Sequence, residues 1–179
     1  MKWFRKHKRH IEWEKLCDWL TDLKTKPHKI IVGTDSQPVR DGEIFASVIC
    51  ILSPTSHFDR CYFYQRELRC KHSHTLYDRM FAEAMTTIEI AERLKREISE
   101  SLNIELHLDL ASTPKGKTFK YSQGLMSMAK GFNYSQVEIK PNSWAASCIA
   151  DKFSKPSKNL KFSRINAYAE EMYTEPLHA

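Results

Sequence analysis

Apolar residues recur along the chain with two different periods, and each change of period marks the boundary of an expected element. Spacings of three and four indicate amphipathic helices, whereas a β-branched run or strict alternation indicates a strand. Asp41-Gly42 is a tight-turn signal between two strands, and Lys26-Pro27 ends the first helix. The expected elements are a helix over residues 8–24, strands over 29–35, 44–52 and 58–66, a helix over 75–101, a strand over 104–109, a helix over 118–131, a strand over 134–139 and a helix over 142–153 capped by Asn142 or Ser143.

This order of elements predicts the fold class. After the first helix the chain reads β-β-β-α-β-α-β-α, which is an α/β arrangement. Hairpins followed by β-α crossovers predict a mixed five-stranded sheet flanked by helices, with the strand over 29–35 beside and parallel to the strand over 104–109. We divide the chain into a basic N-terminal helical leader, residues 1–27, one α/β domain, residues 28–155, and a basic C-terminal tail, residues 156–179.

Four acids fall where this fold would bring them together. Asp35 and Asp109 end the two strands that we expect to be neighbours, at the edge where ligands of open α/β sheets bind. Glu83 lies within about 80° of the centre of the apolar stripe of the long helix, so it is the acid of that helix nearest the sheet. Asp151 shares a face of the last helix with Trp144, at a position where the pattern favours an apolar residue.

Carboxylates brought together repel one another and raise each other's pKa values unless a divalent cation neutralises them. Oxygen-only ligands suit Mg²⁺ or Mn²⁺, and two such ions about 3.5–4 Å apart support phosphodiester cleavage. For each acid alone, a structural role is the ordinary alternative: Asp35 and Asp109 would cap loops, Glu83 would lie on the helix surface, and Asp151 would pair with a lysine. Their joint expected placement favours a metal site.

Five stretches carry a family resemblance: Val32–Gln37, Glu83-Ala84, His107–Asp109, Lys140-Pro141, and Trp144–Ser147 with Ala150-Asp151. Over residues 28–155 the chain resembles the YkuK-type family of predicted ribonuclease H-like nucleases. The ribonuclease H fold has the same element order, with acids on the first strand, first helix, fourth strand and last helix. The resemblance therefore implies that Asp35, Glu83, Asp109 and Asp151 are catalytic residues that bind Mg²⁺ or Mn²⁺.

The charge of the chain indicates an anionic partner. The 28 Lys and Arg residues against 22 Asp and Glu residues give a net charge of +6, and basic residues crowd both ends. Solvated termini that only aid solubility would show the same charge. The candidate nucleic-acid contacts are Ser36 and Gln37 beside the first acid, Lys115 and Lys117 after Asp109, and Lys152 and Lys155 near the C-terminus.

Other side chains are expected to be structural. We interpret His107 as a hydrogen-bonded core histidine rather than a residue that assists a metal ligand. Trp3 and Trp13 are expected to pack on the domain rather than to stack on bases. The spacing of Cys70, His72 and His74 matches no standard zinc module, and five scattered cysteines without a C-x-x-C pair predict reduced thiols.

The sequence also restricts location and function. The longest nearly apolar stretch, Ile44–Leu52, is shorter than the roughly 20 residues that cross a bilayer as a helix, and no secretory signal starts the chain, so we expect a cytoplasmic protein. The leading hypothesis is a ribonuclease H-type nuclease that cleaves RNA or the RNA of an RNA/DNA hybrid. A structure-selective DNA nuclease or resolvase and a non-catalytic nucleic-acid-binding module are the alternatives.

Overall fold

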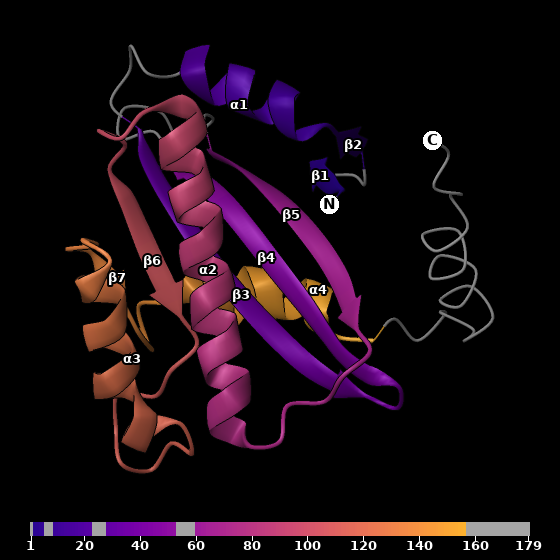
Figure 1. Ribbon diagram of the computed structural model, residues 1–179, viewed down its shortest axis with the longest axis vertical. Helices are drawn as coiled ribbons and strands as arrows, with labels where there is room; N and C mark the ends of the chain where they lie inside the picture. The colour runs from indigo at the N-terminus through magenta and orange to yellow at the C-terminus, as the bar shows by residue number, and fades with distance from the viewer. Residues whose placement is uncertain (1, 6–8, 23–27, 53–59, 157–179) are drawn as a thin grey trace, which may run out of the picture.

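The computed structural model describes residues 2–5, 9–22, 28–52 and 60–156. A mixed seven-stranded sheet, ordered β2-β1-β5-β4-β3-β6-β7, lies between α2 on one face and α4 on the other (Figure 1). The elements are β1 Trp3–Arg5, β2 Arg9–Ile11, α1 Trp13–Asp22, β3 Lys29–Val39, β4 Gly42–Leu52, β5 Arg60–Arg69, α2 Leu76–Ile98, β6 Ile104–Leu108, α3 Phe119–Gly131, β7 Val137–Glu138, the π-helical segment η2 Ala145–Ala150, and α4 Asp151–Ser154.

The predicted fold class is confirmed. β3, β4 and β5 form an antiparallel meander, and β6 runs parallel to β3, with Val32 opposite Leu106. β7 adds a further parallel strand beside β6. The capping box between Thr75 and Asp78 fixes the start of α2, which follows the meander and crosses the sheet to reach β6.

Two short strands extend the sheet beyond the five that we expected. β1 pairs with β5, and β2 pairs with β1, so the start of the chain belongs to the same sheet. The predicted start of the first helix at residue 8 is wrong, because residues 9–11 are a strand and α1 begins at Trp13. The pairing buries Trp3 against Trp13, with ring centroids 5.6 Å apart, which confirms that these rings pack on the domain.

Several other boundaries differ from the prediction. β3 continues past Asp35 to Val39, because the β3–β4 hairpin extends to a turn at Gly42, whose φ is +150°. β5 ends at Arg69, three residues later than expected. β7 is only two residues long; Tyr134, the expected start of this strand, precedes it, is buried and donates a hydrogen bond to Glu92 of α2 at 2.6 Å. The last helix begins as η2 at Ala145, and neither Asn142 nor Ser143 caps it.

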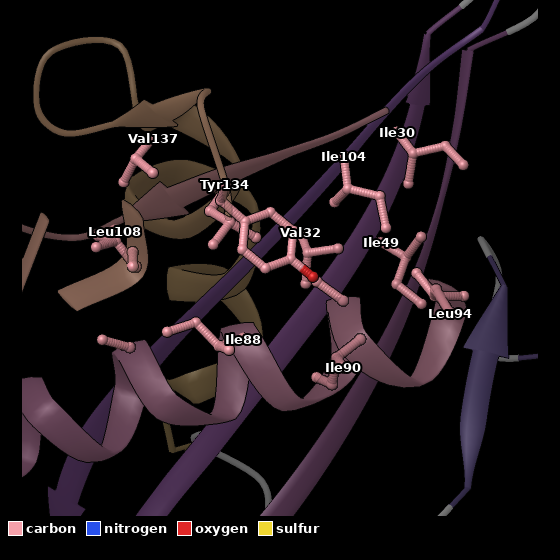
Figure 2. Packing of buried hydrophobic residues seen from close by; sticks show 14 of the residues in the cluster. Ile30, Val32, Ile49, Ile88, Ile90, Leu94, Ile104, Leu108, Tyr134 and Val137 are labelled. Carbon is pink, nitrogen blue, oxygen red and sulfur yellow. The ribbon is translucent and has the colours of Figure 1, made fainter. Parts of the chain in front are cut away.

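The sheet separates two clusters of buried apolar side chains. Figure 2 shows the larger cluster, in which Val32 and Ile49 of the sheet meet Ile88 and Leu94 of α2. The smaller cluster lies on the opposite face and joins Ile31 to η2 and α4. Successive residues of β3 therefore face different layers. No helix in the described ranges is long and apolar enough to span a bilayer.

Candidate metal centre

The carboxyl end of β6 places Asp109 beside Asp35. The last pair between the two parallel strands is Thr34 with Leu108, so one further step of this register would bring Asp35 opposite Asp109. Beyond Leu108 the chain turns away, with the Leu110 amide donating to the Leu108 carbonyl at 2.8 Å. Asp35 thus lies within β3 and is the first residue beyond the segment that pairs with β6, so the sheet is open on its β6 side at this point.

Strand alternation sends Asp35 and Ser36 to opposite faces of the sheet. Asp35 follows Ile31 and Gly33 toward η2 and α4, whereas Ser36 follows Val32 toward α2. Glu83 of α2 reaches the edge from the Ser36 side, and Asp151 of α4 reaches it from the Asp35 side. The acids therefore come from both faces of the sheet and meet where β6 ends.

Glu83 is buried, 4% exposed, and held by one residue of β3. Ser36 donates to its Oε1 twice, from the backbone N–H at 3.1 Å and from Oγ at 2.6 Å. Burial raises the pKa of Glu83 well above its ordinary value, and the charges of Asp35 and Asp109 raise it further against the opposing Ser36 bond. The sequence arithmetic that placed this acid nearest the sheet agrees with its burial.

Asp35 is equally buried, 5% exposed, and its Oδ2 accepts a hydrogen bond from Ser154 Oγ at 2.5 Å. Burial raises the pKa of Asp35 to about 6; the Ser154 bond opposes this rise, and the charges of Asp109 and Asp151 add to it. Ser154 was not among the predicted site residues. Its signal in the sequence is the spacing of three from Asp151, which places both on one side of α4.

Lysines accompany the two more exposed acids. Lys140 Nζ lies 2.8 Å from Oδ1 of Asp109, and Lys155 forms an ion pair with Asp151 one helical turn earlier. The Lys155 pair is the structural alternative that the sequence allowed for Asp151. These lysines place positive charge beside a centre that otherwise gathers four carboxylates.

The donor set fits a hard divalent cation in its chemistry, because all four side chains offer carboxylate oxygens. Asp35 interacts electrostatically with Asp109 and Asp151, and Glu83 with Asp35 and Asp109. Each carboxylate is nevertheless turned toward its own serine or lysine. Within the described ranges, no three His, Cys, Asp or Glu side chains stand at the spacing that holds one metal ion. Cation binding would require these side chains to rotate.

The predicted nucleic-acid contacts occupy different environments. Ser36 is buried, and its hydroxyl donates a hydrogen bond to Glu83 rather than facing solvent. Gln37, the next residue of β3, is half-buried. Lys115, Lys117 and Lys152 are exposed. Lys155 is also exposed but paired with Asp151. The tail residues 157–179, which we expected to contribute further basic contacts, lie outside the described residues.

A buried chain of polar groups holds η2 against the sheet. Lys29 pairs with Glu105, whose other oxygen lies 2.7 Å from His107 Nε2. His107 Nδ1 accepts the N–H of Ala145 at 3.0 Å, which assigns the ring proton to Nε2. Burial lowers the pKa of His107, so the ring is neutral. The interpretation of His107 as a hydrogen-bonded core residue is confirmed.

This chain predicts a stability loss on substitution of its central residue. We expect His107→Leu to lower the free energy of unfolding by about 2–4 kcal/mol, because the Ala145 N–H and a Glu105 oxygen would both be left unpaired in the core. Urea titration measures the loss. The matched control is His72→Leu at an exposed position, expected within about 0.5 kcal/mol of the unmodified chain. Equal losses of stability for the two substitutions would contradict the structural role of the His107 hydrogen bonds.

The arrangement defines an α/β protein with a carboxylate centre at the carboxyl ends of parallel strands, the position where open α/β sheets bind ligands. Residues 13–155 match the Ribonuclease H-like family. The match covers most of the chain, and the chain belongs to this family. The matched region includes α1, which the sequence pattern assigns to the N-terminal leader. The comparison with curated proteins finds no match, and the comparison with solved structures finds none.

Proposed function

We propose that the chain is a metal-dependent nuclease that hydrolyses phosphodiester bonds in RNA or in the RNA strand of an RNA/DNA hybrid. The observation that carries this proposal is the meeting of two buried carboxylates, Asp35 and Glu83, from opposite faces of the sheet. Burial is the largest cause that raises the pKa of both groups, and it outweighs the opposing Ser154 bond at Asp35 and the opposing Ser36 bond and Arg79 charge at Glu83. A purely structural centre would gain stability from neutral residues, so retention of these acids favours a role in binding cations.

In this proposal Asp35, Glu83, Asp109 and Asp151 would hold Mg²⁺ or Mn²⁺, which when bound supplies an activated water and stabilises the leaving oxygen. Ser36 and Ser154 would orient the two buried carboxylates through the hydrogen bonds described above. Lys140 and Lys155 would be released from their ion pairs when the acids turn to a cation. Their ammonium groups would then be free to bind substrate phosphates.

The alternative functions share this centre. A structure-selective DNA nuclease or resolvase would use the same four acids on a different substrate. A non-catalytic nucleic-acid-binding module is favoured by the ion pairs of Asp109 and Asp151 with the protein's own lysines, although the buried Oδ1 of Asp109 accepts no hydrogen bond from the described residues. The three functions differ in which substrates are cleaved, so one substrate panel separates them.

The decisive experiment incubates the full chain with end-labelled single-stranded RNA, RNA/DNA hybrid, duplex DNA and a four-way DNA junction. Each reaction contains Mn²⁺, Mg²⁺ or EDTA. We expect cleavage of an RNA-containing substrate that requires the metal and stops in EDTA. Cleavage confined to duplex or junction DNA would establish the DNA nuclease instead, and binding of the panel without cleavage would establish the binding module.

A further inference from the structure

Aromatic side chains are exposed where α2 and α3 begin. Tyr77 and Phe81, one turn apart on α2, are 43% and 39% exposed, and their ring centroids are 6.1 Å apart. The Tyr77 ring also lies 5.2 Å from that of Tyr121 in the first turns of α3. Phe119 in the same segment is 40% exposed. We call Tyr77, Phe81 and Tyr121 the aromatic patch. Two exposed rings of α2 that extend to a partly buried ring of α3 indicate a binding surface.

Positive charge accompanies this patch on the side of α3. The segment 110–133, which leads from the metal centre through α3, contains four lysines and no Asp or Glu. Lys115, Lys117 and Lys120 are exposed at its start, and Lys120 Nζ lies 4.8 Å from the centre of the Tyr121 ring. On α2 the nearby carboxylate of Asp78 accepts the capping bonds of Thr75. Aromatic rings beside a segment that contains lysines and no acids favour a polyanionic partner that carries flat rings of its own.

The aromatic patch borders the metal centre. The Ala111 N–H donates to Thr118 Oγ1 at 2.8 Å, and Ser122 Oγ donates to the Ala111 carbonyl at 2.7 Å. These bonds fix the first turn of α3 against the chain two residues beyond Asp109. Figure 1 shows the first turns of α2 and α3 at the lower end of the molecule, the end toward which β6 points.

We propose that this surface binds an unpaired stretch of nucleic acid next to the bond to be cleaved. Bases stack on the aromatic patch, while Lys115, Lys117 and Lys120 contact the phosphates. The inference rests on the proposed nuclease function and narrows its substrate class to strands with a single-stranded segment. Fully paired duplexes keep their base faces stacked on one another, so they cannot use the aromatic patch.

The test measures affinity without cleavage. Fluorescence anisotropy in EDTA compares a single-stranded RNA with a blunt duplex of the same sequence, for the full chain and for the double variant Tyr77→Leu/Phe81→Leu. Leucine keeps an apolar side chain but has no aromatic face. The matched control is Phe132→Leu, a substitution of a 42% exposed ring at the other end of α3. Melting temperatures verify that all variants are folded.

We expect the double variant to bind the single strand about tenfold or more weakly, with duplex affinity changed less than about twofold. Phe132→Leu should leave both affinities unchanged. A second variant, Lys117→Gln/Lys120→Gln, should lower the slope of log affinity against log salt by about 1 to 2. This lysine variant tests the phosphate contacts independently of the stacking contacts.

Unchanged single-strand affinity in the double variant, or an equal loss on duplex, would overturn the proposal. A change in sedimentation of the double variant with unchanged RNA affinity would also overturn it and would assign the aromatic patch to contacts between proteins. Failure of the nuclease function is visible separately, as absence of metal-dependent cleavage in the substrate panel while the single-strand binding loss persists in EDTA.

Discussion

Asp35→Asn is expected to abolish metal-dependent cleavage and, at the same time, to stabilise the metal-free protein at neutral pH. Cleavage should fall by well over about 100-fold, because even partners of metal ligands account for 10–100-fold effects. The matched control is Asp41→Asn, at an exposed acid in the β3–β4 turn, which should retain full activity. Initial cleavage rates of the two variants, measured on the substrate that the unmodified chain cleaves, test this prediction.

The stability effect of the same substitution follows from the raised pKa of Asp35. This carboxyl ionises near pH 4 in the unfolded chain and only at about 6 in the folded protein. Between these two pH values the carboxyl ionises more readily in the unfolded chain. The free energy of unfolding therefore falls as pH rises from 4 to 6 and stays constant above pH 6. Asparagine cannot ionise, so the substitution removes this loss of stability, although it also weakens the Ser154 hydrogen bond. We therefore expect the free energy of unfolding to rise by about 1–2 kcal/mol at pH 8 and not to rise at pH 4.

Urea titrations at pH 4, 6 and 8 in EDTA measure this gain, with Asp41→Asn as the control that should show no pH-dependent gain. A loss of stability at pH 8 would instead identify Asp35 as a structural residue. Added Mn²⁺ provides an independent comparison: at 100 times its dissociation constant it should stabilise the unmodified chain by about 2.7 kcal/mol. The same addition should stabilise Asp35→Asn much less.

Gly33→Ala is expected to destabilise the fold and to weaken the metal centre together. A Cβ at this position would lie 2.8 Å from the backbone nitrogen of Ala146 and 3.2 Å from the Ala145 carbonyl carbon. Both atoms belong to the η2 backbone, which is held by His107 and cannot yield as a flexible side chain would. We expect a loss of about 2–3 kcal/mol in the free energy of unfolding. Displacement of η2 would also move Asp151, the residue that follows it.

Gly124→Ala is the matched control for Gly33→Ala. Gly124 lies within α3, and a Cβ there would meet no atom within 4 Å. Alanine should therefore raise stability by about 0.5–1 kcal/mol through its better helix propensity. Urea titration compares the two variants, and the cleavage rate should fall only for the Gly33 variant. If both glycines accept alanine equally well, close packing of η2 on β3 does not limit stability.

Local patterns were sufficient to predict the central part of the fold. The β-branched run before Asp35 and the alternation before Asp109 identified two neighbouring parallel strands, and these two acids marked the edge of the candidate centre where the pairing of the strands stops. Angular spacing on α2 identified Glu83 as the acid nearest the sheet. These features depend on residues close together in the sequence, because a helix or strand presents its side chains with a fixed period.

Patterns at the ends of the chain were less informative. The two N-terminal strands are three residues each, too short for alternation to distinguish them from a helix, and their pairing depends on β5, which is distant in sequence. The last helix begins as a π-helical segment, which a long-range bond to His107 and close packing on Gly33 hold against the sheet. Helical periodicity predicts only that a helix exists there, not its winding.

Local patterns predicted the order of the elements, the parallel strands near Asp35 and Asp109, and the four acids of the candidate centre. Long-range packing brings these acids from both faces of the sheet and gives them Ser36, Ser154, Lys140 and Lys155 as partners. Chain periodicity fixes the direction of a side chain relative to its own element. Its partner across the sheet depends on where β6 ends and how η2 packs, which long-range contacts decide.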